Sequence, residues 1–329
     1  MSVRLGAIAD IHGNDVALRA VLADAGRFGV ERWWALGDLV LFGPRPAEVL
    51  QILRELPGIG MLRGNTDRYV LTGEQPAPHE TVADAAGSID LVRRYAGMAA
   101  GIGWTRGVLD QAGLLGVLDD WPAQLRLRLP GGASVLGVHA SPRADDGQGI
   151  EPGIADEELG PLLAGADAEV VIGGHTHAAT DRVVGGVRAL NPGSTGLPRR
   201  SGIASWLLLG DDGDGLTVTI RDVPFDAEAV VADLRRRRHP QTEFVSSVLA
   251  GLLGAGDAVE PVAEEGALGG LCPPGYPLAY PVRHALPGRS CAEPHAPRKF
   301  SRTTGVLLGP RLWNPMGPSS PACLARSRW

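Results

Sequence analysis

Five short segments of this chain place side chains that can bind metal ions directly after predicted β-strands. They are Asp10-Ile11-His12, Gly37-Asp38, Gly64-Asn65-Thr66-Asp67, Val138-His139-Ala140 and Gly174-His175-Thr176-His177. A lone Asp-x-His motif is a weak signal, but five segments in this order, each after an apolar run, predict a two-metal hydrolytic site. Such a site favours one chemistry, the attack of a metal-bound hydroxide on a phosphorus centre.

The predicted ligands combine imidazole and oxygen donors, a set that suits Mn first, with Fe, Zn, Co or Ni as alternatives, rather than Ca or a bare Mg site. They are Asp10, His12, Asp38, Asn65, His139, His175 and His177. Two divalent ions bring four positive charges and the two aspartates remove two. A bridging hydroxide and one phosphodiester anion would balance the rest. The count supports an anionic phosphate substrate, but it does not select diester over monoester.

The elements that must position these segments begin as alternating strands and helices. Apolar periodicity predicts strands at 3–9, 33–36 and 58–62 and helices at 15–27 and 46–56. This β-α-β-α-β order indicates a doubly wound layered fold. In such folds the residues just past the carboxyl ends of the strands converge on one edge, where ligands bind.

The second half of the body is predicted to add more strands. Residues 80–120 have a helical pattern and are expected to pack beside the sheet or to cap the site. The remaining predictions are strands at 125–129, 134–138, 169–172, 182–184, 187–190, 204–209 and 216–222, and helices at 154–163 and 226–238. The first two of these strands are joined by Pro130-Gly131-Gly132, which predicts a hairpin.

The chain of 329 residues is expected to form one large domain, residues 1–245, followed by a tail, residues 246–329. Residues 251–329 contain 12 Pro and 11 Gly with little periodicity, so we expect this tail to be disordered or loosely packed. Hydrophobic content of 44% and charged content of 21% are ordinary for a globular protein with a buried core.

The charge balance argues against nucleic acid as a main partner. The net charge is −6, and the first 250 residues hold 23 Lys/Arg against 32 Asp/Glu. Binding to nucleic acid backbones depends on neutralising phosphates, so a nuclease would need a basic groove that this acidic body does not favour. A small phosphorylated substrate is expected instead, and the sequence leaves the oligomeric state open.

Cysteine usage and hydropathy bear on localisation. Cys272, Cys291 and Cys323 all lie in the last sixty residues, so the body has neither a disulfide framework nor a thiolate site, as in a reducing cytoplasm. The apolar stretch 5–9 is too short for a signal peptide. No run of about eighteen apolar residues predicts a membrane span. We therefore expect a cytoplasmic protein without a membrane partner.

The ordered five-part pattern resembles the calcineurin-like metallophosphoesterase superfamily, in its compact branch of bacterial and archaeal phosphodiesterases and phosphatases, over about residues 1–240. The resemblance implies an α/β fold, a four-layer α/β/β/α sandwich with a dinuclear metal site at the carboxyl ends of the strands. It implies one metal ion on Asp10, His12 and His177, a second on Asn65, His139 and His175, and Asp38 bridging both. Asp38, His12 and Asn65 are the residues expected to take part in catalysis by a metal-bridging hydroxide.

One position departs from the pattern of many superfamily members. They carry a histidine after the Gly-Asn pair that protonates the leaving group, whereas this chain has Thr66. A threonine hydroxyl is not acidic enough for general acid catalysis near neutral pH. Catalysis would then favour good leaving groups, or would use His12 or a metal-bound water as the acid.

The predicted function is a metal-dependent phosphoesterase, with phosphodiesters as first substrates and phosphomonoesters as second. The alternative is a non-catalytic metal-site scaffold that binds protein partners, because the superfamily includes such a member, a retromer subunit that also lacks the histidine. All seven ligand positions are intact here, which favours the enzyme. Asn191-Pro192-Gly193-Ser194 resembles a family feature, a turn that packs behind the His175/His177 loop.

Other polar residues allow two interpretations. Asp67 either orients a neighbouring ligand or caps the next helix. Arg63, Arg68, Arg199 and Arg200 could reach a substrate phosphate, but an ordinary surface role is favoured for each, as it is for His79 and His239. Of Trp33 and Trp34, one ring is expected in the core and the other half exposed.

Overall fold

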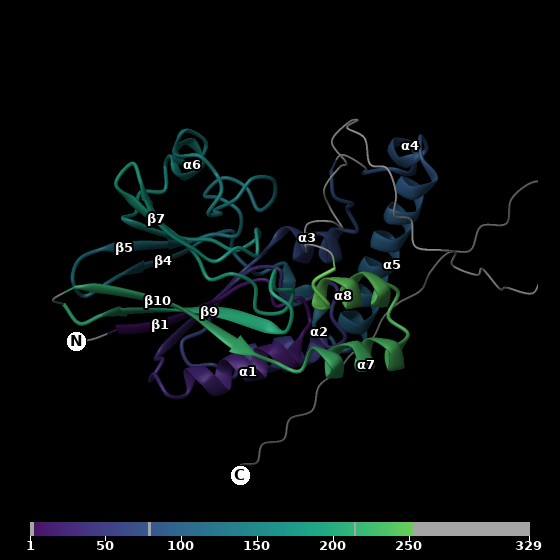
Figure 1. Cartoon of the computed structure of the whole chain (residues 1–329), viewed down its shortest axis with the longest axis horizontal. Coiled ribbons are helices and arrows are strands. Elements are labelled where there is room, and N and C mark those ends of the chain that lie inside the picture. The colour runs from purple at the N-terminus through teal and green to yellow at the C-terminus, as the bar shows by residue number, and fades with distance from the viewer. Residues whose placement is uncertain (1–2, 78–79, 214, 253–329) are drawn as a thin grey trace, which may run out of the picture. The chain divides into compact units, whose positions relative to one another are not determined.

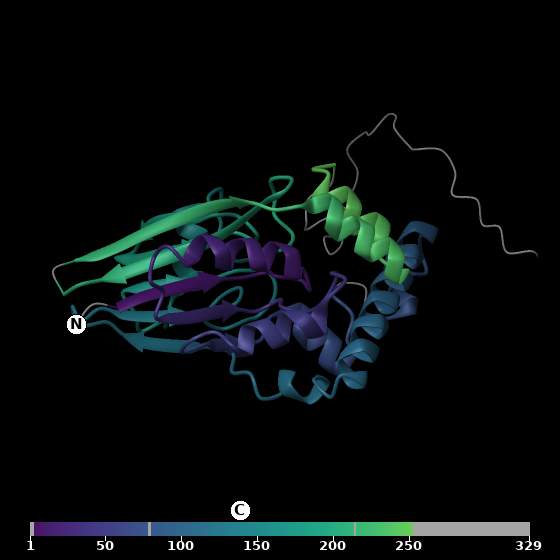
Figure 2. The same ribbon diagram turned by 90° about the horizontal axis from the view of Figure 1, so that it is seen from below.

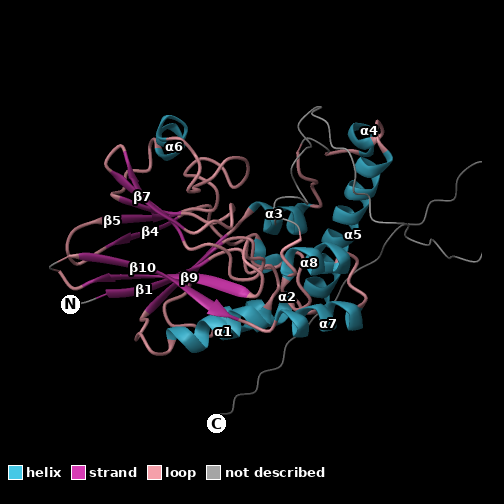
Figure 3. Cartoon of the chain, viewed as in Figure 1, coloured by secondary structure: helices cyan, strands magenta, loops and turns pink. Residues whose placement is uncertain are grey.

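A computed structural model gives the fold and describes residues 3–77, 80–213 and 215–252. Two five-stranded sheets lie face to face, and helices cover the outer face of each (Figure 1). Figure 3 separates the strands of this sandwich from the helices that surround it. The four-layer α/β/β/α sandwich is therefore confirmed.

The first sheet has the strand order β10-β9-β1-β2-β3. Its strands are β1 (Val3–Ile8), β2 (Arg32–Leu36), β3 (Gly60–Leu62), β9 (Ile203–Asp211) and β10 (Leu216–Pro224). The first three are parallel, and β9 pairs antiparallel with both β1 and β10. Helix α1 (Asp15–Ala25) lies across the outer face (Figure 2), and α2 (Pro46–Arg54) and α7 (Ala227–Arg237) pack against α1.

The second sheet has the order β4-β5-β6-β8-β7. Its strands are β4 (Leu125–Arg128), β5 (Ser134–Gly137), β6 (Val170–Ile172), β7 (Thr180–Val184) and β8 (Val187–Asn191). Strands β5, β6 and β8 are parallel, and β4 and β7 pair antiparallel at the two edges. Helix α6 (Asp156–Leu163) covers the outer face of this sheet through Leu159 and Leu163.

Two neighbouring tryptophans show why the core has separate layers. Successive side chains of a strand point to opposite faces, so Trp33 of β2 faces the helices while Trp34 faces the second sheet. A Cβ atom at Gly137 of β5 would lie 2.9 Å from the Trp34 ring, so only glycine admits this close packing. Both rings are buried, and the expectation that one is half exposed was wrong because a second sheet, not solvent, covers the inner face.

The remaining helices gather beyond the carboxyl ends of the strands. They are α3 (Asn65–Thr72), α4 (Val82–Ala85), α5 (Ile89–Gln111), the 3₁₀ helix η1 (Leu115–Leu118) and α8 (Thr242–Leu249). The helical pattern predicted for 80–120 corresponds to α4, α5 and η1. Helix α8 was not predicted, and it crosses the expected boundary after residue 245. Because residues 253–329 lie outside the described residues, the division into domain and tail stays a prediction.

No helix among the described residues combines the length and the apolar character that crossing a bilayer requires.

Candidate metal centre

The seven predicted ligand side chains converge where the carboxyl ends of five strands meet. Asp10 and His12 follow β1, Asp38 follows β2, Asn65 follows β3, His139 follows β5, and His175 and His177 follow β6. All except His175 are less than 10% exposed. The structure thus brings together every residue of the predicted ligand set, although the elements that carry them span more than 160 positions of the sequence.

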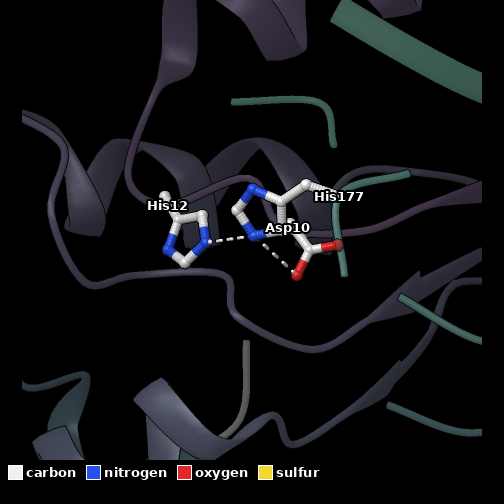
Figure 4. Close-up of side chains that lie close together, drawn as sticks. All are labelled: Asp10, His12 and His177. Atoms are coloured by element: carbon white, nitrogen blue, oxygen red, sulfur yellow. Dashed lines mark hydrogen bonds and ion pairs between the residues drawn. The ribbon is translucent and has the colours of Figure 1, made fainter. Parts of the chain in front are cut away.

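The first group is Asp10, His12 and His177, whose ring nitrogens and carboxylate point toward one another (Figure 4). The Nε2 atoms of His12 and His177 lie 3.3 Å apart, and Nε2 of His177 lies 3.4 Å from Oδ1 of Asp10. This is the arrangement expected of three ligands around one ion.

The second group is built around Asp38 and the side-chain oxygen of Asn65. Nε2 of His139 lies 3.3 Å from Oδ1 of Asp38 and 3.0 Å from Oδ1 of Asn65, and Nδ1 of His175 lies 3.2 Å from the same amide oxygen. The other carboxylate oxygen of Asp38 lies 3.8 Å from Nε2 of His12. Asp38 therefore faces both groups, as a shared ligand must.

Main-chain carbonyls fix which nitrogen of each imidazole faces the site. Nδ1–H of His12 donates to the carbonyl of Leu41 at 3.2 Å, and Nδ1–H of His177 donates to Leu197 at 2.7 Å. A carbonyl can only accept, so these bonds assign the proton to Nδ1 and leave Nε2 for a ligand. When both rings are neutral, their lone pairs face each other, an arrangement that a shared proton or a metal ion can satisfy.

The same reasoning assigns a different nitrogen to His175. Its Nε2–H donates to the carbonyl of Gly147 at 2.7 Å, so Nδ1 is the atom that faces Asn65. His139 follows the usual pattern, because its Nδ1–H donates to the carbonyl of Leu36 at 2.7 Å. Three histidines therefore offer Nε2 and His175 offers Nδ1.

Without a bound cation, the pKa values of the ligand histidines depend on their burial and on the neighbouring carboxylates. Burial lowers the pKa of His12 to about 4, so this imidazole is neutral at pH 7. Burial also opposes protonation of His139, but the charge and hydrogen bond of Asp38 outweigh it and raise the pKa of His139 to about 10. The pKa of His177 is raised in the same way by Asp10. A divalent ion would displace these protons, as metal binding to histidine does.

The backbone at the ligands adopts conformations that most side chains avoid. Five of the seven ligands have positive φ angles: Asp10 (54°), His12 (49°), Asp38 (56°), His175 (69°) and His177 (57°). Such left-handed residues are uncommon outside glycine, and they gather at functional sites where the surrounding structure holds them. Here the left-handed residues occur as the chain leaves β1, β2 and β6.

Glycines allow the ligand loops to approach one another. Gly37 precedes Asp38 with φ of 84°, and a Cβ atom there would lie 2.6 Å from Nδ1 of His139. A Cβ atom at Gly64 would lie 2.2 Å from Oδ1 of Asp38. Any larger residue at either position would separate the loops that carry the second group.

Asp67 and Asn191 support the ligand loops from behind. Asp67 accepts hydrogen bonds from the backbone N–H groups of Gly64, at 3.0 Å, and of Leu39, at 2.9 Å. Both interpretations of Asp67 therefore hold, because one carboxyl caps α3 and holds the loop after Asp38. The side-chain amide of Asn191 donates to the carbonyl of Gly174 at 2.7 Å, so the Asn-Pro-Gly-Ser turn packs behind the His175/His177 loop as expected.

The centre opens into a cavity of about 500 Å³. Its lining residues, besides the ligands His12, Asp38, Asn65, His175 and His177, are Phe42, Thr66, Ala77, Asp146, Gly147, Gln148, Gly149, Glu151, Thr176, Leu197 and Arg199. No residue of the segment 80–120 lines this cavity. That segment packs against α2 and α3 instead.

The four arginines have different positions. Arg199 lines the cavity, donating from Nε to the carbonyl of Thr176 at 2.9 Å and from Nη2 to Glu151 at 3.3 Å. Arg200 pairs with an exposed aspartate. The other two do not line the cavity: Arg63 lies 3.9 Å from Asp119, and Arg68 pairs with Asp145 and lies 3.7 Å from the cavity-lining Asp146.

Several residues near the site were not found from the sequence. Phe42 forms part of the cavity wall and contacts the His12 ring, with centroids 5.2 Å apart. Tyr69 contacts the amide of Asn65 and donates to Asp146. The two glycines of Gly147-Gln148-Gly149 are a local signal that could have indicated a loop, but nothing in that sequence indicates a cavity. His239 is buried rather than on the surface, because α5 and α8 enclose it, and His79 lies outside the described residues.

The sequence profile of the calcineurin-like phosphoesterase superfamily domain matches residues 3–211. An uncharacterised protein of Methanocaldococcus jannaschii is 32% identical over 139 residues, which are 42% of this chain and 50% of that protein. The chain thus spans about half the length of this curated relative.

Two solved structures share the fold. A hypothetical protein from Pyrococcus horikoshii has a TM-score of 0.64 at 23% identity, over 77% of this chain and 100% of that one. A metallophosphoesterase from Sphaerobacter thermophilus has a TM-score of 0.57 at 27% identity, over 76% of this chain and 100% of that one.

Proposed function

The chain belongs to the calcineurin-like phosphoesterase superfamily, and we propose that it is a metal-dependent phosphoesterase that hydrolyses small phosphodiesters, with phosphomonoesters as second substrates. The convergence of seven ligand side chains at a cavity of about 500 Å³ carries this proposal. The likeness to a protein named as a metallophosphoesterase, 27% identical, supports it.

The donor set fits two divalent ions, with manganese first and iron, zinc, cobalt or nickel as alternatives. One ion would be held by Asp10, His12 and His177, the other by Asn65, His139 and His175, with Asp38 shared. Bound there, the ions would supply positive charge for the phosphoryl oxygens and activate water as the nucleophile.

The chain's own residues orient the shared carboxylate. The backbone N–H of Thr66 donates to Oδ1 of Asp38 at 2.9 Å. The N–H groups of Leu39 and Val40 are held by Asp67, which fixes the loop that follows Asp38. A carboxylate held in this way keeps its geometry while substrates enter and leave, which is what preorganised catalysis requires.

His12 has no free N–H to donate to a leaving group. The N–H of His12 is occupied by the carbonyl of Leu41, and its other nitrogen faces His177. Substrates whose leaving groups are acidic alcohols are therefore expected to react best. Phe42 provides an apolar wall for such a group.

The cavity also suits a small anion better than a polymer. Arg199 is the one Lys or Arg side chain that lines it among the described residues. A nucleic acid backbone needs several phosphate contacts along its length. We therefore propose a small phosphorylated substrate as the partner. We also propose that the protein works in the cytoplasm.

Thr66 favours a second candidate, a metal-site scaffold that binds protein partners without turnover. A scaffold would hold its metal ions with the same ligands as an enzyme, so only an assay of ester hydrolysis distinguishes the two. The test is hydrolysis of bis-p-nitrophenyl phosphate with added Mn²⁺ by the unmodified protein, by Asp38→Asn and by Asp90→Asn. The last is a matched control, because Asp90 is exposed on α5 and its carboxylate pairs with Arg93, which is also exposed.

The phosphoesterase proposal expects metal-dependent turnover that is lost in Asp38→Asn and kept in Asp90→Asn. A parallel assay with p-nitrophenyl phosphate separates diester from monoester preference. If the unmodified protein binds Mn²⁺ but turns over neither ester faster than Asp38→Asn, the enzyme proposal fails and the scaffold replaces it.

A further inference from the structure

The hydroxyl of Thr66 is buried beside the ligands and has no hydrogen-bond partner among the described residues. The residue is 2% exposed. A buried polar group without a partner costs free energy relative to an apolar group of the same shape, and valine has that shape. The unpaired hydroxyl therefore indicates a group that something outside the chain can satisfy.

The position of Thr66 identifies where that partner would lie. Thr66 directly follows the ligand Asn65, its backbone N–H is bonded to the shared carboxylate of Asp38, and the residue is part of the lining of the 500 Å³ cavity. The other buried atoms without partners belong to Gln75, Thr105, His239, Gln241 and Ser246, and none of these residues lines the cavity.

The local helix gives the hydroxyl no partner. Threonine inside a helix commonly donates to the carbonyl three or four residues earlier. Thr66 stands in the first turn of α3, which begins at Asn65, so no preceding helical turn supplies that carbonyl. Burial holds the side chain of Thr66, and the hydrogen bond to Asp38 holds its backbone.

We propose that the Thr66 hydroxyl donates a hydrogen bond to a phosphoryl oxygen of the substrate, and so positions the phosphate at the metal centre. This inference rests on the proposed phosphoesterase function. Phosphoryl oxygens only accept hydrogen bonds, so the threonine is the donor. No proton is transferred and no bond to Thr66 forms, which means that the residue binds the phosphate without acting as the acid for the leaving group.

The test compares Thr66→Val, which removes the hydroxyl at constant shape, with Thr66→Ser, which keeps it. Binding of inorganic phosphate to the Mn²⁺-loaded protein is measured by calorimetry. Because hydrogen bonds to charged groups are strong, Thr66→Val should weaken phosphate binding about tenfold or more, while Thr66→Ser should stay within about threefold of the unmodified protein. Manganese content, measured on the same samples, should not change.

A second readout needs neither metal nor phosphate. Replacing an unsatisfied hydroxyl with a methyl group should raise the Tm of the metal-free protein, by about 2–4 °C for a unit of this size. Thr105→Val is the matched control, because Thr105 is also buried without a partner but lies on α5 away from the cavity. It should raise the Tm and leave phosphate binding unchanged.

Three results would overturn the inference: phosphate binding that is equal in Thr66→Val and the unmodified protein, an equal loss in Thr66→Ser, or a lower Tm for metal-free Thr66→Val. These outcomes are independent of turnover. If the loaded protein binds phosphate through Thr66 yet hydrolyses no ester, the proposed function fails while this inference stands.

Discussion

The phenol oxygen of Tyr69 lies 3.5 Å from the amide nitrogen of Asn65, one helical turn earlier on α3, and donates its own proton to Asp146. An amide whose nitrogen is held by Tyr69 must turn its oxygen the other way, toward His139 and His175. A residue that touches no ion thus decides which atom of Asn65 faces the metal centre.

Tyr69→Phe should therefore weaken metal binding at the second group. Partners that orient a ligand typically contribute 10–100-fold to metal affinity or activity, and the long contact to Asn65 suggests the lower end, about tenfold. Titration of metal-free protein with Mn²⁺ measures the effect. Tyr95→Phe, on α5, is the matched control and should bind like the unmodified protein. Equal Mn²⁺ affinities in the unmodified protein, Tyr69→Phe and Tyr95→Phe would show that Asn65 is oriented without the phenol of Tyr69.

Metal binding should also stabilise the fold, since the ligands come from distant segments. At a metal concentration 100 times the dissociation constant, the free energy of unfolding should rise by about 2.7 kcal/mol. For a unit of this size that corresponds to a Tm increase of about 5–10 °C. Thermal melts with Mn²⁺ and with excess chelator measure the difference. Asp38→Asn should show a clearly smaller shift, and an identical shift would remove Asp38 from the ligand set.

The ligand positions could be predicted because strand ends can be recognised in a sequence. An apolar run followed by a polar residue marks the end of β1 before Asp10 or of β2 before Asp38. The left-handed φ angles of these residues could not be predicted. Aspartate and histidine adopt that conformation several-fold more often than most other residues, yet it stays uncommon even for them, and here the loops packed around the site impose it.

The partition of the strands into two sheets also depends on contacts distant in sequence. Alternating strands and helices predicted layers, but nothing in β9 indicates that it pairs with β1, whose residues lie two hundred or more positions earlier. Helix α8 was missed for a related reason. Eight residues make a marginal helix in isolation, and this one is stabilised by packing, including the contact of Phe244 with Phe42 at 5.4 Å.

Buried His239 should make the stability of the fold depend on pH. Its Nδ1 accepts the backbone N–H of Gln241 at 3.2 Å, and its ring meets the Trp104 ring edge-on at 4.3 Å. Burial lowers the pKa of His239 from the ordinary 6.5 to about 4. The unfolded chain therefore binds the proton more readily, so stability is full above pH 6.5 and falls as the pH drops toward 4.

The loss attributable to His239 at pH 4 is about 3 kcal/mol. His239→Phe keeps the ring contact and removes the titration. Urea unfolding of both proteins in the presence of chelator, at pH 7.5 and pH 4.5, isolates the effect, because the other titrating groups are common to both. Relative to the unmodified protein, His239→Phe should have a higher free energy of unfolding at pH 4.5 than it has at pH 7.5. A difference that does not change with pH would show that His239 has an ordinary pKa.

Gly101 should resist replacement even though it lies inside a long helix. A Cβ atom there would lie 1.9 Å from Oε1 and 2.4 Å from Cδ of Gln241, which is itself buried. Alanine improves helix propensity by about 1 kcal/mol, but overpacking costs about 1–3 kcal/mol, so Gly101→Ala should be neutral to destabilising. Gly103→Ala, at an open position of the same helix, should stabilise by up to about 1 kcal/mol. Equal gains in both variants would show that Gln241 moves aside freely.

Arg199 provides the last prediction, because it and Arg200 form a matched pair on one loop. Arg199 lines the cavity with a side chain that is 53% exposed, whereas Arg200 pairs with Asp222 and does not line it. Solvent screening limits a contact of such a side chain with a phosphate to about 1 kcal/mol, or about fivefold in affinity. A guanidinium that contacts ground state and transition state alike changes KM and leaves kcat nearly constant. Arg199→Ala should therefore raise KM for bis-p-nitrophenyl phosphate about fivefold, and Arg200→Ala should leave it unchanged. A fall in kcat with constant KM would instead mean that Arg199 acts only in the transition state.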